Sequence, residues 1–242
     1  MTSDDPLAPA REKVALACRI LARQGLVEGI LGHVSVRIDE RSMLIRCRGP
    51  EDIGVLHTAV SDIRLVDLDG EHLEDSPDYN VPNELPIHGE LMKARPQINS
   101  VVHAHPWASV VCGIAELELR PVFGAFNIPA MRMARAGVAV FQRGCLITRP
   151  DLADQMIDAM DGSDACLLRG HGITSAGETV EASTIRALDL DTLARMTVQL
   201  HQVGATAPAT ISEEDVAELP DLGATFNEQR VWRHLAAGDR RE

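Results

Sequence analysis

The segment Val101-Val-His-Ala-His-Pro106 constrains the fold of this 242-residue chain more than any other stretch. Its apolar start predicts a strand over residues 98–105, and Pro106 is expected to open the helix that follows. Residues two apart in a strand point to the same face. His103 and His105 should therefore project together, within reach of one metal ion. A lone His-x-His motif is more often a pair of polar strand residues, so this interpretation needs further support.

The rest of the chain mixes strands and helices without the regular spacing of repeated βαβ units. Alternating or apolar runs predict strands at residues 33–38, 43–48, 63–68, 145–148 and 165–168. Helical spacing and helix-ending residues predict helices at residues 10–24, 84–95, 106–115, 149–160 and 178–201. We expect one layered α/β domain over residues 1–204. Residues 205–242 should form a tail that packs on this domain or on a neighbouring subunit.

Composition excludes several classes of function. The 23 Lys and Arg against 36 Asp and Glu give a net charge of −13, and aromatic residues make up only 3%. Both features argue against nucleic-acid binding. The first residues lack the basic and apolar regions of a secretory signal, and the longest uncharged run, residues 96–115, contains histidines and prolines that argue against a membrane span. Five scattered cysteines without a CxxC pair predict reduced thiols and a cytoplasmic location.

Two further motifs carry groups of the same chemistry. Gly170-His171-Gly172 follows a short apolar strand, and its glycines allow a sharp turn that presents the imidazole at the strand end. Upstream, Glu84 and His88 are spaced i and i+4 on the predicted helix and should share one face. Taken singly, the first motif is equally a glycine-rich turn, and the second is more often a solvated helix face.

Together these segments resemble the class II aldolase/adducin family over roughly residues 8–203. The motifs that carry the resemblance occur in the family's order. They are Gly32-His-Val-Ser-Val-Arg37, Pro82-x-Glu84-x-x-x-His88, Ala94-Arg-Pro96, Val101-Val-His-x-His105 and Leu167-Leu-x-Gly-His-Gly172. The resemblance implies a single-domain, three-layer α/β/α fold around a mixed, largely antiparallel sheet. It also implies homotetramers with the site at a subunit boundary.

The resemblance further implies a metal held by His103, His105 and His171, with Glu84 as the catalytic carboxylate. Neutral imidazoles leave a divalent ion coordinatively open, so that it acts as a Lewis acid toward a chelating substrate. One zinc, manganese, iron or cobalt ion per subunit would suit such ligands. The developing negative charge of an enolate would be stabilised there, whether the bond broken leads to an aldehyde or to CO₂.

The sequence departs from the sugar-phosphate aldolases of this family where they bind phosphate. It has Gly32-His33 in place of Gly-Asn, and Pro82-Asn83-Glu84 in place of Ser-Ser-Glu. It also has no tyrosine after Tyr79, whereas some family aldolases use a C-terminal tyrosine as proton donor. Arg46 and Arg48 alternate on one predicted strand, where they would bind a carboxylate or form a solvated edge. These features resemble the aromatic-acid decarboxylase branch.

We therefore expect a metal-dependent carbon–carbon lyase that decarboxylates a small hydroxylated aromatic dicarboxylic acid of the 3,4-dihydroxyphthalate type. Arg48, with Arg46, would hold the second carboxylate. Glu84 or His33 would relay the proton, and His88 would support Glu84 or lie in the core. The alternatives are an aldolase or epimerase acting on a sugar or sugar phosphate, and a non-catalytic adducin-like module.

Overall fold

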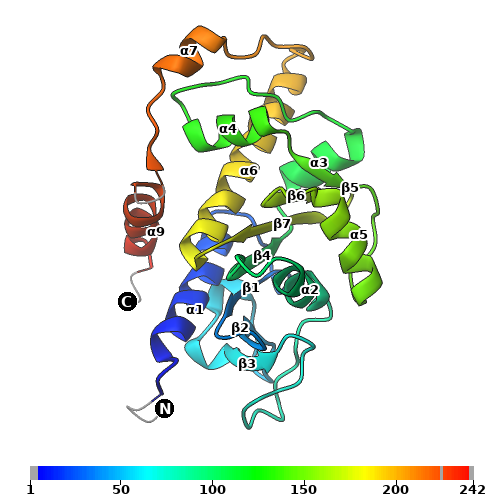
Figure 1. Ribbon diagram of the computed structural model, residues 1–242, viewed down its shortest axis with the longest axis vertical. Helices are drawn as coiled ribbons and strands as arrows, with labels where there is room; N and C mark the ends of the chain where they lie inside the picture. Colours follow the sequence, from blue (N-terminus) through cyan, green and yellow to red (C-terminus); the bar gives the residue numbers. More distant parts are fainter. Residues whose placement is uncertain (1–4, 224–225, 240–242) are drawn as a thin grey trace.

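The computed structural model describes residues 5–223 and 226–239, and the strands in this part of the chain form one seven-stranded sheet (Figure 1). The spatial order is β3-β2-β1-β4-β7-β6-β5. Neighbouring strands are antiparallel except β5 and β6, which are parallel. The predicted mixed, largely antiparallel sheet is thereby confirmed. The strands are β1 (His33–Arg37), β2 (Ser42–Arg46), β3 (Ile63–Asp67), β4 (Ser100–Ala104), β5 (Ala139–Phe141), β6 (Ala165–Leu168) and β7 (Gly172–Gly177).

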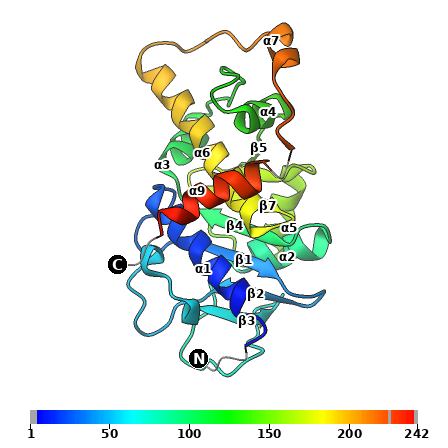
Figure 2. The ribbon, with the colours of Figure 1, turned by 90° about the vertical axis from the view of Figure 1, so that its left-hand side faces the viewer.

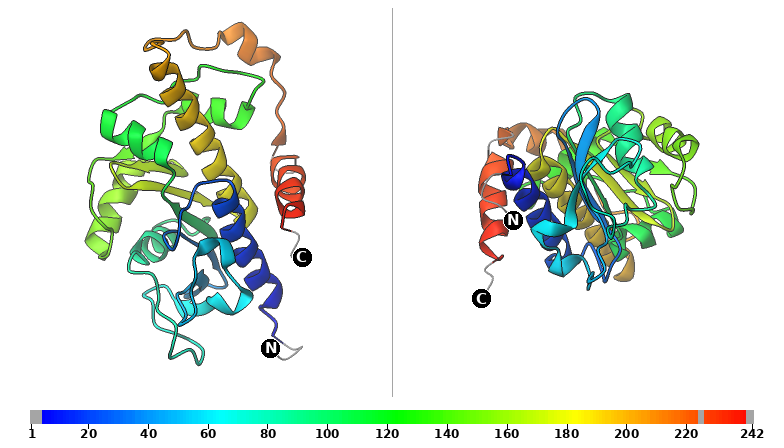
Figure 3. Two further views of the ribbon diagram at one scale, coloured as in Figure 1. Left: turned by 180° about the vertical axis from the view of Figure 1, so that it is seen from behind. Right: turned by 90° about the horizontal axis from the view of Figure 1, so that it is seen from below.

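Helices cover both faces of this sheet and complete the expected three layers (Figures 1 and 3). One face carries α1 and α6, with α3 and α4 packed on α6, and the other carries α2 and α5. The described helices are α1 (Ala8–Arg23), α2 (Pro86–Ala94), α3 (Trp107–Ala115), α4 (Ile128–Ala136), α5 (Pro150–Met160), α6 (Val180–Gln202), α7 (Glu213–Glu218) and α9 (Trp232–Ala237).

The central strand β4 is fixed from both sides by two separate apolar cores. Val102 belongs to the core beneath α1 and α6, whereas Val101 belongs to the core beneath α2 and α5. Both side chains are fully buried, and burying a side chain of this size contributes about 1.5–3 kcal/mol. Because alternate residues of a strand face opposite ways, His103 shares the α2 and α5 side with Val101.

One predicted strand is absent, and strands β5 and β7 were not predicted. The strand expected at residues 145–148 is wrong, because this stretch is irregular and β5 pairs with β6 instead. Strand β7 was not predicted, because its sequence Gly-Ile-Thr-Ser-Ala-Gly has no alternation. The small residues allow α6 to approach closely: a Cβ at Gly177 would lie 2.8 Å from the backbone nitrogen of Ser183.

The described part of the C-terminal tail packs on its own domain. Helix α9 lies beside α1 (Figure 2), where Arg19 and Arg23 form ion pairs with Asp239. Trp232 packs against the core beneath α1 and α6. Among the described residues, no helix has both the length and the apolar composition needed to cross a membrane.

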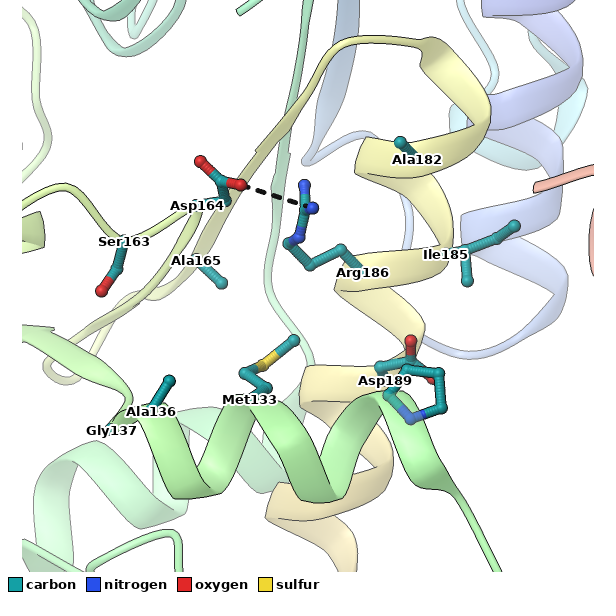
Figure 4. A pocket seen from close by; sticks show the side chains of 11 residues that line it. Met133, Ala136, Gly137, Ser163, Asp164, Ala165, Ala182, Ile185, Arg186 and Asp189 are labelled. Carbon is teal, nitrogen blue, oxygen red and sulfur yellow. Dashed lines mark ion pairs between the residues drawn. The ribbon is translucent and has the colours of Figure 1, made fainter. Parts of the chain in front are cut away.

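A cavity of about 380 Å³ lies between α4, α6 and the start of β6, at the end of that strand away from His171 (Figure 4). On its wall, Arg186 forms an ion pair with Asp164 at 3.4 Å. Asp189 accepts a hydrogen bond from the Asn127 side chain at 2.8 Å. Burial raises the pKa of Asp189 to about 6, although the Asn127 hydrogen bond and the charge of Arg186 oppose the shift.

Asp189→Asn should stabilise the protein above pH 6. Above pH 6 the Asp189 carboxyl is ionised in the folded state, where burial makes the charge unfavourable and lowers the free energy of unfolding. This destabilisation disappears below about pH 4, where the carboxyl is protonated in both the folded and the unfolded state. We expect the Tm to rise by roughly 2–5 °C at pH 7.5, and the gain to shrink as the pH falls through 6 toward 4. Asp154→Asn, at an exposed position, is the control. An equal gain in Tm at pH 7.5 and at pH 4 would contradict the assignment.

Candidate metal centre and active site

Strand register places the imidazoles at one end of the sheet. His33 on β1 lies directly opposite His103 on β4, so both side chains are on the α2 and α5 face. His105 follows the end of β4, and His171 lies in the turn between β6 and β7. That turn depends on two glycines. Gly170 adopts a φ of 65°, and Gly172 approaches Ala104 too closely for a Cβ.

Four side chains converge there. One ligand atom from each of Glu84, His103, His105 and His171 lies within 4.8 Å of all the others. The Nε2 atoms of His103 and His105 are 2.8 Å apart. Oε2 of Glu84 is 3.4 Å from Nε2 of His103 and equally far from Nε2 of His171. The structure thus brings together the three histidines and the carboxylate that the sequence singled out.

The orientation of these rings fits a bound cation. Nδ1 of His103 donates to the Ile173 carbonyl oxygen at 3.0 Å, so a neutral ring directs the lone pair of Nε2 into the cluster. Both ring nitrogens of His171 are buried without a hydrogen-bond partner among the described residues. A buried polar atom without a partner is costly, and a divalent metal would accept the lone pair of one of these nitrogens.

The electrostatics favour a charged Glu84 carboxylate and a neutral His105 ring. Burial opposes ionisation of Glu84, but the adjacent rings of His103 and His171 outweigh it and hold the pKa of Glu84 well below its usual value. Burial, together with His103 and His171, lowers the pKa of His105 to about 3. Neutral imidazole is the form that binds metals.

Glu84 lies in the turn before α2 rather than inside the helix, because the helix begins at Pro86. The prediction that Glu84 and His88 share one helix face is therefore wrong. Oε1 of Glu84 accepts a hydrogen bond from the Ile147 backbone N–H at 2.8 Å, which leaves Oε2 for the imidazoles. The sequence carries no signal for this contact, since a backbone N–H is the donor and residue 147 is in irregular structure.

His88 is fully buried and makes its hydrogen bonds to His33 and Ser35. Nε2 of His88 is 2.7 Å from Nδ1 of His33, and Nδ1 of His88 is 2.6 Å from Oγ of Ser35. His88 therefore contacts the site by orienting the His33 ring. The sequence analysis missed Ser35, although its spacing of two from His33 on a strand places both on one face.

The two arginines differ in their partners. Arg46 is 2% exposed, donates to Oγ1 of Thr58 at 2.9 Å and forms an ion pair with Asp52 at 2.6 Å. It alternates with Ile45, so it lies on the opposite face of the sheet from the cluster. Arg48 is half-buried in a β-bridge with Asn80, and its side chain has no ion pair or hydrogen bond within the described ranges. Of these two arginines, Arg48 is the one without an acidic partner in the described part of the chain.

The chain is similar to known proteins over most of its length. The model of the Class II Aldolase and Adducin N-terminal domain matches residues 12–198. The chain is 50% identical to a 3,4-dihydroxyphthalate decarboxylase of Arthrobacter keyseri, covering 95% of this chain and 94% of the relative. It is 46% identical to a protein of the same name from Terrabacter sp. (strain DBF63), covering 95% and 97%. An aldolase II superfamily protein from Pseudomonas syringae is similar in fold, with a TM-score of 0.81 at 19% identity over 97% and 94%.

His103→Ala should abolish stoichiometric metal binding. The substitution removes a buried nitrogen at the centre of the cluster, and we expect affinity for zinc to fall more than about 100-fold. Metal content after dialysis against a calibrated chelator measures the change. His234→Ala, on the exposed side of α9, is the matched control and should keep wild-type affinity. Retention of one tightly bound ion by the His103 variant would refute the ligand assignment.

Proposed function

Because the chain belongs to the class II aldolase and adducin family, we propose that it is a divalent-metal-dependent decarboxylase of a hydroxylated aromatic dicarboxylic acid. The first candidate substrate is 3,4-dihydroxyphthalate, the compound in the names of the relatives. The observation that carries the proposal is the convergence of three imidazoles and one carboxylate at the end of β4. This arrangement suits cleavage of a carbon–carbon bond that leaves its electron pair on the substrate.

His103, His105 and His171 would hold the ion, with Glu84 beside it. When bound, the metal supplies Lewis acidity toward the oxygens of the substrate. Zinc, manganese, iron and cobalt all accept imidazole ligands, and we propose one such ion per chain. The contact between His103 and the Ile173 carbonyl keeps Nε2 of this ring aimed at the ion.

Glu84 is suited to move the proton, and His33 is the other candidate. The carboxylate would accept the proton of the ring hydroxyl and return it to the ring carbon that CO₂ leaves. The electron pair of the broken bond then forms the new C–H bond, so charge and atoms balance. The Ile147 N–H holds one carboxylate oxygen while the other faces the imidazoles.

Arg48 would bind the second carboxylate of the substrate. Its side chain is not engaged by an acidic residue in the described part of the chain, whereas Asp52 already neutralises Arg46. A guanidinium binds a carboxylate through two parallel hydrogen bonds. We therefore assign the carboxylate contact to Arg48 and a structural role to Arg46.

Exposed apolar side chains near the cluster support a homo-oligomer, and we propose the tetramer of the family with the site at a subunit boundary. Trp107, two residues after His105, is 51% exposed, and Leu146, next to Ile147, is 56% exposed. Ile114 is 61% exposed beside the Gly170 turn. Large exposed apolar side chains beside a site are consistent with a protein–protein contact. A cytoplasmic location agrees with five free cysteines.

Release of CO₂ from 3,4-dihydroxyphthalate by protein loaded with manganese, iron, cobalt or zinc tests the function. We expect release that depends on metal and stops with a chelator. Glu84→Gln should keep the ion on three imidazoles and lose at least about 100-fold in kcat, because it cannot carry the proton. Loss of metal in this variant would make Glu84 a ligand. Cleavage of sugar phosphates without CO₂ release would favour an aldolase.

Arg48→Met should raise KM for the dicarboxylate by about 10–100-fold, because a hydrogen-bonded ion pair to the substrate is lost. The metal content should not change. Arg41→Met is the matched control, since Arg41 is exposed in the turn between β1 and β2. An unchanged KM for the Arg48 variant would show that this residue does not bind the substrate.

A further inference from the structure

The hydrogen-bonded chain Ser35–His88–His33 has a direction, and the direction follows from burial. Ser35 is fully buried, and in the described part of the chain its hydroxyl contacts only Nδ1 of His88. The O–H must therefore donate to that nitrogen. The reverse order would leave a sealed O–H without an acceptor, which lowers its population by about tenfold or more.

Starting from Ser35, the position of the proton on each ring determines its position on the next ring. Nδ1 of His88 accepts the serine proton, so a neutral His88 carries its own proton on Nε2. That N–H donates across 2.7 Å to Nδ1 of His33. A neutral His33 then carries its proton on Nε2.

Nε2 of His33 is the end of the chain that can meet a substrate. It has no hydrogen-bond partner among the described residues. It is also not fully enclosed by protein, and His33 is 6% exposed. The ring centroid lies 5.1 Å from that of His103, a residue of the metal cluster. This N–H is thus adjacent to the position proposed for the substrate oxygens.

We propose that Ser35 and His88 are positioning residues that hold His33 as a neutral N–H donor toward a substrate oxygen, which leaves proton transfer to Glu84. The inference rests on the proposed decarboxylase function. A His that gives up a proton needs a partner that stabilises its charged form, as a carboxylate does in a Ser-His-Asp triad. Here the chain ends in a serine hydroxyl, which supplies no such charge. His33 therefore stabilises developing charge without becoming the acid.

Nitrogen-15 NMR of the histidine rings tests the tautomer directly, in metal-free and in zinc-loaded wild-type protein. Two-bond ¹H–¹⁵N correlations distinguish protonated from unprotonated ring nitrogens, and the His33→Gln spectrum assigns the signals of His33. We expect a proton on Nε2 and none on Nδ1 of His33. A proton on Nδ1 would overturn the inference. The spectrum reports the tautomer whether or not CO₂ is released. Failure of the tautomer prediction can therefore be distinguished from failure of the proposed function.

Kinetics of variants test the consequence. Ser35→Ala should mix the two tautomers of His33 and lower kcat by about 10–100-fold, with little change in KM or metal content. Ser100→Ala is the matched control, because this buried serine on β4 donates to the Ser35 carbonyl oxygen and does not contact His88. It should keep both kcat and the wild-type tautomer. Equal losses in the two variants would overturn the inference.

His33→Gln and His33→Ala separate a hydrogen-bond donor from a proton donor. Glutamine keeps an N–H but cannot act as an acid, so kcat should remain within about tenfold of wild type. Alanine removes the donor and should cost about 100-fold or more. If glutamine were as inactive as alanine, His33 would be the proton donor and the assignment to Glu84 would be wrong.

Discussion

The convergence of ring nitrogens from His103, His105 and His171 is the constraint on which the site depends. Neutral imidazole nitrogens 2.8 Å apart need a shared proton or a cation between them. The fold holds them there because β4 is fixed by one core through Val101 and by the other through Val102. Much of the sheet therefore serves to keep one strand end in place.

The residues that would hold the ion and move the proton form one group, and the residues that orient His33 form another. Imidazoles and a carboxylate face the proposed ion, while the two buried side chains behind His33, His88 and Ser35, include no carboxylate or other acidic group. The Ile147 N–H and the Ile173 carbonyl, both backbone groups, orient Glu84 and His103. Groups that do not themselves react thus determine which atoms of the reacting residues face the substrate.

Sequence patterns predicted what depends on local spacing and missed what depends on packing. The His-x-His strand and the Gly-His-Gly turn were visible because a period of two and flanking glycines determine side-chain direction. Strand β7 was missed because contact with α6 selects small residues there. The expected strand through Arg46 and Arg48 ends at Arg46, and its pattern could not show that Arg46 faces away from the cluster and pairs with Asp52. The same limit hid the link from Ser35 to His33.

X-ray absorption spectroscopy of the zinc-loaded and cobalt-loaded protein tests the central claim most directly, since it counts the ligands on the ion itself. The account predicts one ion per chain with three imidazole nitrogens at about 2.0–2.1 Å and the remaining positions filled by oxygen. Sulfur in the coordination shell, or fewer than three imidazoles, would contradict it. Either result would place the metal, and the chemistry that depends on it, elsewhere in the protein.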